Sequence, residues 1–110
     1  MRRAQQAALD EVRAGAVCRE VDDHARRAVE ADLGVGFDHG LGHGVGLEVH
    51  EAPRLARTAD GALPEGAVVT IEPGIYRPGW GGVRIEDDVV LGAEGPHILT
   101  DFPRELMELD

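Results

Sequence analysis

The sequence predicts an α+β fold in which two helices precede an antiparallel sheet and a short helix closes the chain. Two apolar stripes of helical period lie before residue 34, and two apolar runs typical of strands lie after residue 66. Most of the 15 glycines lie between residues 34 and 95, which indicates tight turns and close backbone approaches. With 110 residues the chain forms one domain at most.

The first helix is expected from residue 2 to residue 14. Apolar side chains recur every four residues through Ala4, Ala8 and Val12, which places them on one face. Gly15 follows as the residue that ends the helix.

The second helix is expected from residue 19 to residue 32, with Gly34 as its C-terminal stop. Its apolar stripe consists of Val21, Ala25, Ala28 and Val29. The opposite, solvated face carries two aspartates and, four residues after each, an arginine: Asp22, Asp23, Arg26 and Arg27. Opposite charges at this spacing modestly stabilise an exposed helix face.

The segment from residue 36 to residue 53 is rich in glycine and histidine, with a short apolar alternation through Val45, Leu47 and Val49. Residues 54–66 are polar and contain turn dipeptides, so they are expected to form a loop.

The sheet is expected in the last third of the chain. Strands are predicted over residues 67–71 and 83–91, with a break at Pro73-Gly74, a wide turn over 78–82 and a short third strand over 98–100. A closing helix is predicted over residues 102–109, with Asp101 as its N-cap and Pro103 at its first position.

The formal net charge of −10 excludes nucleic acid and anionic membranes as partners, because both would repel the chain. The single cysteine, Cys18, excludes an internal disulfide and fits a reducing compartment. The sequence contains neither an apolar run of membrane-spanning length nor a signal-peptide pattern, so a cytoplasmic location is expected.

Three of the five histidines, His39, His43 and His50, fall within twelve residues among closely spaced glycines. Neutral imidazole is a common ligand of transition metals, and glycines let a substrate approach it closely. The zincin pattern H-E-x-x-H and the pattern G-x-G-x-x-G are both absent. The alternative interpretation is a glycine-rich turn that happens to contain histidines.

Two strand glutamates accompany these histidines. Glu72 ends an apolar strand, where an ionised carboxylate needs a cation or several donors unless it is solvated. Period-two alternation places Arg84, Glu86 and Asp88 on one face, so that this face presents a cation between two carboxylates. The alternative interpretation is a plain surface ion pair between Arg84 and Glu86. The other face carries Val83, Ile85 and Val89. Carboxylates with one imidazole suit manganese, cobalt or zinc.

Three ordered motifs support a family resemblance: His39-Gly-x-Gly-His43 followed by Gly46-Leu47-x-Val49-His50-Glu51-x-Pro53, then Thr70-Ile71-Glu72-Pro73-Gly74-x-Tyr76, then Val83-Arg84-Ile85-Glu86-Asp87-Asp88. They resemble the pita-bread metallopeptidase family (M24), in particular its Xaa-Pro aminopeptidase and Xaa-Pro dipeptidase (prolidase) branch. The Arg-Ile-Glu-Asp run favours this branch over the methionine aminopeptidases. The resemblance implies that residues 1–110 are the C-terminal half of a pita-bread catalytic domain, with a curved antiparallel sheet.

The resemblance also implies the metal ligands. His43 and Glu72 would bind one metal of a two-metal centre, and Glu86 would bridge both metals. The cofactor implied is a pair of divalent ions, manganese first, with cobalt or zinc as alternatives.

The remaining roles concern substrate and proton transfer. His39 and His50 would lie around the substrate, with His50 near the scissile carbonyl. Tyr76 and Arg84 would form a hydrogen-bonded relay beside the metals, and Glu72 would accept the proton of the attacking water. The expected substrate is a proline-containing peptide, cleaved by metal-assisted hydrolysis.

The sequence departs from the family in one respect. Two aspartate ligands that precede the first helix in family members have no counterpart here, so the chain is expected to be a fragment that is inactive alone. A homodimer is expected, because two copies could cover each other's open sheet edges. The alternative function is a non-catalytic pita-bread binding module, as in some chromatin and ribosome-associated proteins.

Overall fold

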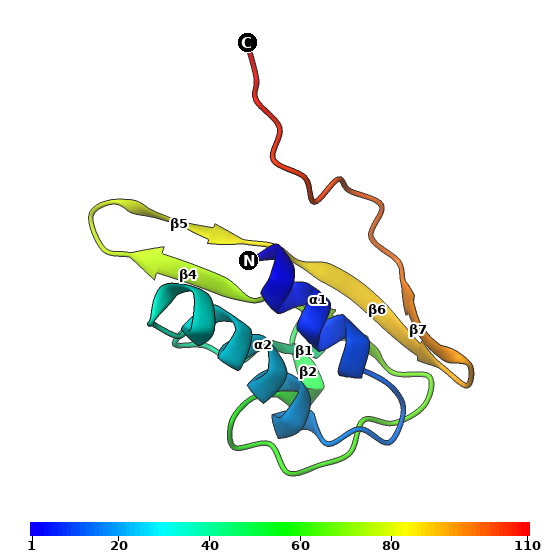
Figure 1. The fold of residues 1–110 in the computed structure, drawn as a ribbon. Helices are drawn as coiled ribbons and strands as arrows, with labels where there is room; N and C mark the ends of the chain where they lie inside the picture. Colours follow the sequence, from blue (N-terminus) through cyan, green and yellow to red (C-terminus); the bar gives the residue numbers. More distant parts are fainter.

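The computed structural model describes all residues, 1–110, and begins with two helices packed side by side in front of a sheet (Figure 1). Helix α1 spans Arg2–Glu11 and helix α2 spans Cys18–Leu33. Gly34 ends α2 in the left-handed conformation at φ 68°, as the sequence predicts. Cys18 is buried at the start of α2, and this burial raises the pKa of its thiol above the ordinary value.

Seven strands follow the helices, and all of their pairings are antiparallel. Their bounds are β1 Gly42–Gly44, β2 Glu51–Leu55, β3 Val68–Ile71, β4 Gly74–Arg77, β5 Gly81–Arg84, β6 Asp87–Gly92 and β7 Gly95–Ile98. Five strands form a sheet in the order β2-β1-β3-β6-β7, while β4 and β5 form a separate two-stranded hairpin. Figure 1 shows this hairpin projecting beyond the N-terminal end of α1.

The core lies between the helices and the five-stranded sheet. Aliphatic side chains from both layers are fully buried there, and they include Ala8, Val21, Leu41, Val69 and Leu91. Phe37 is the one aromatic residue in this core, as the 4% aromatic content requires. The two-layer α+β arrangement of the sequence-based prediction is confirmed.

The connection between the helices shortens α1, which was expected to reach residue 14. Val12 is buried and extended, with ψ 118°, so the helix ends at Glu11. The following residues pair instead with a distant loop, since the Gly15 amide donates to the Leu63 carbonyl and the Leu63 amide donates to the Ala16 carbonyl. These tertiary hydrogen bonds replace the last helical turn.

The solvated face expected on α2 is wrong in half of its residues. Asp22 has no exposed surface and Arg26 is 4% exposed, whereas the neighbouring pair Asp23–Arg27 lies in solvent. Asp22 and Arg26 occupy buried positions because they hydrogen-bond each other and the backbone that enters β1.

The strand expected over residues 83–91 is two strands. It breaks at Ile85 and Glu86, because β5 pairs with β4 while β6 pairs with β3. Val83 therefore lies on the uncovered hairpin and is 52% exposed, contrary to the expected packed face. The third strand lies earlier than expected, at β7. The turn expected over residues 78–82 is shorter, because the hairpin tip is residues 78–80 and Gly81 and Gly82 belong to β5.

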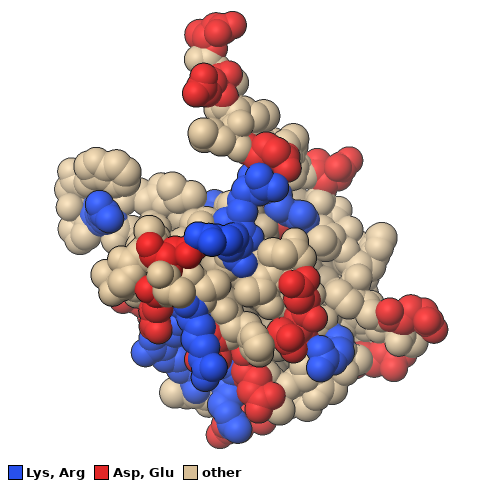
Figure 2. Space-filling model, in the orientation of Figure 1, with Lys and Arg blue, Asp and Glu red and all other residues tan.

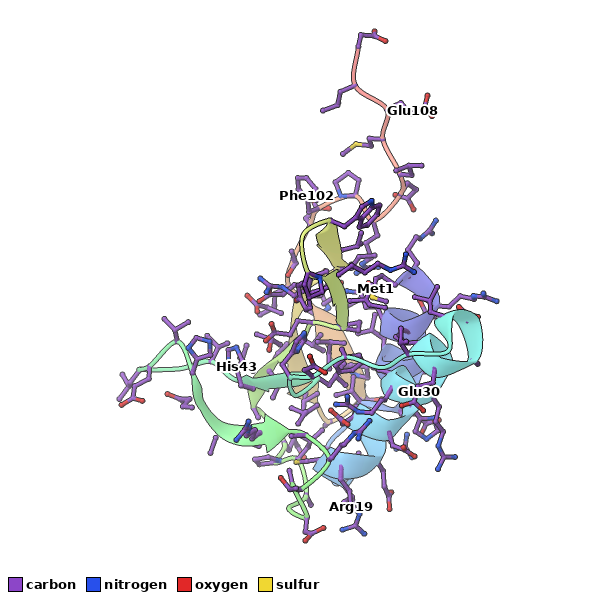
Figure 3. The ribbon with its side chains drawn as sticks, turned by 90° about the vertical axis from the view of Figure 1, so that its left-hand side faces the viewer. Met1, Arg19, Glu30, His43, Phe102 and Glu108 are labelled. Atoms are coloured by element: carbon purple, nitrogen blue, oxygen red, sulfur yellow. The ribbon has the colours of Figure 1, made fainter.

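The histidine-rich segment also differs from its expected pattern. The apolar alternation through Leu47 and Val49 is a solvent-exposed loop, and the strand that follows it, β2, occupies the start of the region expected to be a loop. In Figure 3 this loop projects from the body of the molecule beside His43.

The closing helix predicted over residues 102–109 is absent, and the chain is extended there. Phe102, Leu106 and Leu109 are between 69% and 91% exposed, so a helical stripe has nothing to pack against. Arg104 instead pairs with the buried carboxylate of Asp87 at 2.7 Å, which holds the start of the tail beside β6. The end of the tail extends away from the body (Figure 1).

Charge is mixed over the helical face of the molecule. In Figure 2 arginines and carboxylates alternate over the helices, and acidic residues lie along the tail. Ion pairs such as Arg3–Asp32 and Arg27–Asp23 account for part of this mixing. No helix in the structure combines the length and the apolar character that a membrane crossing requires.

We predict that Gly42→Ala destabilises the protein by about 2 kcal/mol or more, because overpacking in a closed contact forces the backbone to move. A Cβ atom at Gly42 would overlap the Thr70 carbonyl oxygen. Gly61→Ala is the matched control, since a Cβ there meets nothing within 4 Å. Urea unfolding monitored by circular dichroism measures both changes, and equal stabilities of the two variants would contradict the close approach of β1 and β3.

Candidate active site

Strand β1 carries His43 and is held mainly by its neighbours. The His43 amide donates to the Thr70 hydroxyl oxygen at 3.0 Å, and β1 pairs with both β2 and β3. The ring Nδ1 lies 2.9 Å from the Gly44 carbonyl oxygen. Because a carbonyl oxygen can only accept, Nδ1 carries the proton and donates it to this hydrogen bond. The lone pair of the neutral ring is therefore at Nε2.

Glu72 follows the last residue of β3 and faces this imidazole. Its amide donates to the Leu41 carbonyl at 2.8 Å, and its Oε1 accepts a 2.9 Å hydrogen bond from the Thr70 hydroxyl. Oε1 also lies 3.2 Å from His43 Nε2, and both side chains are largely buried. Two electron-pair donors thus face each other across a distance that only a proton or a cation can bridge favourably.

The second strand glutamate belongs to a separate ion pair. Arg84 Nε lies 3.2 Å from Glu86 Oε2 and 3.9 Å from Glu72 Oε2, so the arginine stands between the two carboxylates. The pKa of Arg84 is raised above its ordinary value, first by a hydrogen bond with the Tyr76 side chain and then by the charge of Glu86. Arg84 is therefore a permanent cation at this position.

The three histidines of the sequence motif meet at one wall. The ring centroids of His43 and His50 are 4.2 Å apart, although His50 is exposed at the end of the projecting loop. The His39 ring lies between Phe37 and Tyr76, at centroid distances of 5.2 and 5.5 Å. Its Nδ1 lies 2.7 Å from the Gly40 carbonyl oxygen, and its Nε2 is buried without a hydrogen-bond partner.

A cleft of about 710 Å³ opens over these groups. Five of the seven candidate residues line it, namely His39, His43, His50, Glu72 and Arg84. Tyr76 and Glu86 do not line it and reach the site through Arg84. The structure therefore brings the histidine and the first glutamate together and keeps the second glutamate behind the arginine.

The donor set meets part of what a metal ion requires. His43 and Glu72 offer an imidazole nitrogen and a carboxylate oxygen, which suit manganese, cobalt or zinc. No group of three or more histidine, cysteine, aspartate or glutamate side chains is positioned to hold a metal ion. The residues fit two positions of a coordination sphere and leave the others to further ligands.

Three residues of the site had no role assigned to them from the sequence. The Thr70 hydroxyl joins the two candidate ligands, and Arg54 adds a cation to the wall of the cleft. Glu51 braces the projecting loop, because its carboxylate accepts the Glu48 amide at 3.0 Å. Period-two alternation would have detected Thr70, which precedes Glu72 by two residues.

Comparison with known proteins places this site in a family. A model of metallopeptidase family M24 matches residues 1–93. The chain belongs to metallopeptidase family M24. An Xaa-Pro dipeptidase of Pyrococcus horikoshii is 48% identical over 106 residues, which cover 94% of this chain and 30% of that relative. The chain therefore spans about 30% of the length of the curated relatives that it matches.

Solved structures of Xaa-Pro peptidases have the same fold. An Xaa-Pro dipeptidase from Bacillus anthracis has a TM-score of 0.90 at 47% identity, covering 96% of this chain and 30% of that one. An X-Pro aminopeptidase from Thermotoga maritima has a TM-score of 0.87 at 48% identity, covering 93% of this chain and 29% of that one. The pita-bread fold predicted from the sequence is confirmed, apart from its closing helix.

A more distant likeness concerns the fold alone. The N-terminal domain of the FACT complex subunit SPT16 from Eremothecium gossypii is 23% identical, with a TM-score of 0.77, over 93% of this chain and 26% of that one. The same arrangement of helices and strands therefore occurs in a protein whose name is not that of a peptidase.

We predict that Thr70→Val lowers the free energy of unfolding by about 1–3 kcal/mol, the cost of leaving buried polar groups without a partner. The valine keeps the shape of the side chain but removes the acceptor of the His43 amide and the donor to Glu72. Thr58→Val is the control, because Thr58 is exposed. Chemical denaturation measures both variants, and a Thr70→Val protein as stable as the control would show that the hydroxyl does not connect β1 to Glu72.

Proposed function

We propose that this chain forms one wall of the active site of an Xaa-Pro metallopeptidase and contributes three of its metal ligands. The observation that carries the proposal is the pairing of His43 Nε2 with Glu72 Oε1 at 3.2 Å in a large cleft of an M24 chain. Relatives named Xaa-Pro dipeptidase, 48% identical to this chain, support the substrate class.

His43 and Glu72 would hold the first metal, and Glu86 would join it as a ligand shared with a second. Arg84 keeps Glu86 near Glu72 through its ion pairs at 3.2 and 3.9 Å. Glu86 is 40% exposed in its side chain and therefore has room to turn toward a metal. The bound metals, manganese or alternatively cobalt or zinc, would lower the pKa of a water molecule and polarise the scissile carbonyl.

The residues of this chain would divide the remaining tasks. Glu72 accepts the proton of the attacking water, since its carboxylate faces the cleft and its Oε1 already accepts a hydrogen bond from Thr70. His50, exposed at the mouth of the cleft, contacts the carbonyl oxygen of the scissile bond. His39 lines the cleft and would contact the substrate with the accessible part of its ring.

The cations of the cleft assist this arrangement. Tyr76 raises the pKa of Arg84, and the guanidinium lies between the two carboxylates, which limits their mutual repulsion. Arg54 lines the cleft and takes part in no ion pair, so it can attract the terminal carboxylate of a short peptide.

We further propose that the site needs ligands beyond those of residues 1–110, and that a homodimer forms in the active protein. The first point is supported by the lack of a third donor beside His43 and Glu72. The second is supported by the open edges of the sheet at β2 and β7.

We predict one weak metal-binding event when manganese or zinc is titrated into the isolated chain at neutral pH. His43→Ala should abolish this event because it removes one of the two facing donors, and His97→Ala on β7 should not. Isothermal titration calorimetry measures the number and strength of the events. Two tight and equivalent events in the monomer would contradict the incomplete ligand set.

We predict that the chain alone does not hydrolyse an Xaa-Pro dipeptide. Once it is combined with the remaining part of an M24 peptidase and supplied with manganese, hydrolysis should appear. In the combined enzyme Glu86→Ala should abolish turnover. His50→Ala should lower kcat by about 10²-fold, the usual cost of losing one contact to the developing oxyanion. His97→Ala is the control, because His97 lies outside the site and its loss should not change turnover. The amount of proline released measures the activity.

Two results would contradict this proposal. Full activity of the lone chain would show that its ligand set is complete. Metal binding by the combined protein without cleavage of any prolyl peptide would favour the non-catalytic binding module.

A further inference from the structure

A buried ion pair on α2 lies behind the cleft and has no role in the proposed chemistry. Asp22 is fully buried and Arg26 is 4% exposed, and both of their hydrogen bonds to each other measure 2.9 Å. Replacing such a pair with apolar side chains is often neutral or stabilising, so stability alone is a weak reason for its presence. Its contacts to other groups indicate what it does.

All of these contacts reach the irregular segment over residues 35–41, which connects α2 to β1. Arg26 donates to the carbonyl oxygens of Phe37 and His39, the latter at 3.0 Å, and its guanidinium lies 4.0 Å from the centre of the Phe37 ring. Asp22 accepts the Leu41 amide at 3.0 Å. One salt bridge therefore fixes the backbone on both sides of His39.

The segment has no helix or strand of its own to determine its path. The ring of His39 contacts the ring of Phe37, and Phe37 packs against Arg26. The ring then contacts Tyr76, the partner of Arg84. The place of His39 in the cleft is consequently set from behind by α2.

The same helix provides a natural comparison. Asp23 and Arg27 form an ion pair of the same spacing at 2.7 Å, one residue further along, but with exposed side chains and no hydrogen bond to the segment over residues 35–41. Stabilisation of α2 by opposite charges four residues apart is common to both pairs. Only the buried pair has donors and acceptors directed at the backbone of the site.

We infer that Asp22 and Arg26 are positioning residues that hold His39 in the cleft wall and thereby set how tightly the peptide binds. This inference rests on the proposed substrate contact of His39. A contact made equally in the ground state and in the transition state changes KM and leaves kcat unaltered.

The kinetic test uses conservative substitutions in the metal-loaded enzyme that contains this chain. Arg26→Lys keeps the charge but cannot reach Asp22 and two carbonyl groups with one planar fork. We expect it to raise KM for an Xaa-Pro dipeptide about tenfold through misplacement of His39, with kcat nearly unchanged. Asp22→Asn should act in the same direction, while Arg27→Lys and Asp23→Asn should leave both constants at their original values.

A double-mutant cycle separates positioning from general destabilisation. If Arg26 acts through His39, adding Arg26→Lys to a His39→Ala enzyme should raise KM no further. Additive effects of the two substitutions on KM would overturn the inference. An Arg26→Lys enzyme with unchanged KM would overturn it as well.

A second measurement needs no activity and keeps the inference separate from the proposed function. In NMR spectra of the chain, Arg26→Lys should abolish the contacts of the His39 ring with Phe37 and Tyr76 and the exchange protection of the Leu41 amide, and Arg27→Lys should preserve them. Retention of these signals in Arg26→Lys overturns the inference. If this variant does not fold, the Arg26 Nε–H of the original chain decides: slow exchange supports the pair, and exchange as fast as that of Arg27 refutes it.

Discussion

The site depends on how closely β1 can approach β3. Strand β1 has three residues, two of them glycines, so it contributes almost no apolar side chain of its own to the core. Gly42 lies directly against the Thr70 carbonyl, and the Thr70 hydroxyl bonds both the His43 amide and the Glu72 carboxylate. A close backbone contact and one hydroxyl group thus determine the distance between the two facing donors, which makes this distance a property of the sheet rather than of flexible side chains.

The buried groups of the site are accompanied by partners that offset their charge. His43 and Glu72 are largely withdrawn from water, where an unpaired carboxylate is costly, and donors converge on Glu72 from Thr70 and, at longer range, Arg84. The arginine is charged at any physiological pH, and its surroundings raise its pKa further. The acidic chain consequently presents a cleft in which imidazoles and arginines offset the carboxylates, although its net charge is −10.

Sequence patterns predicted the features that depend on local chemistry. The helices, the left-handed Gly34 and the strand that leads to Glu72 follow from periodicity and turn chemistry. The placement of His39, His43 and His50 around one cleft was implied by the family resemblance. Tertiary pairing decided the rest. Asp22 and Arg26 resembled their solvated neighbours because helical spacing alone does not show which charges the backbone of another segment will satisfy. The stripe at residues 102–109 has helical period but no surface to cover, so it stays extended.

The division of the strands into two sheets has a mechanical consequence. His43 lies on β1 of the five-stranded sheet and Glu72 directly follows β3 of the same sheet, whereas Tyr76 and Arg84 belong to the β4–β5 hairpin. The two parts join at Pro73 and at residues 85–86, where the Ile85 amide donates to the Pro73 carbonyl at 3.3 Å. A small rotation of the hairpin about this junction would widen or narrow the 3.9 Å gap between Arg84 and Glu72 without moving His43. The electrostatic field over the cleft is therefore coupled to the angle between the β4–β5 hairpin and the five-stranded sheet.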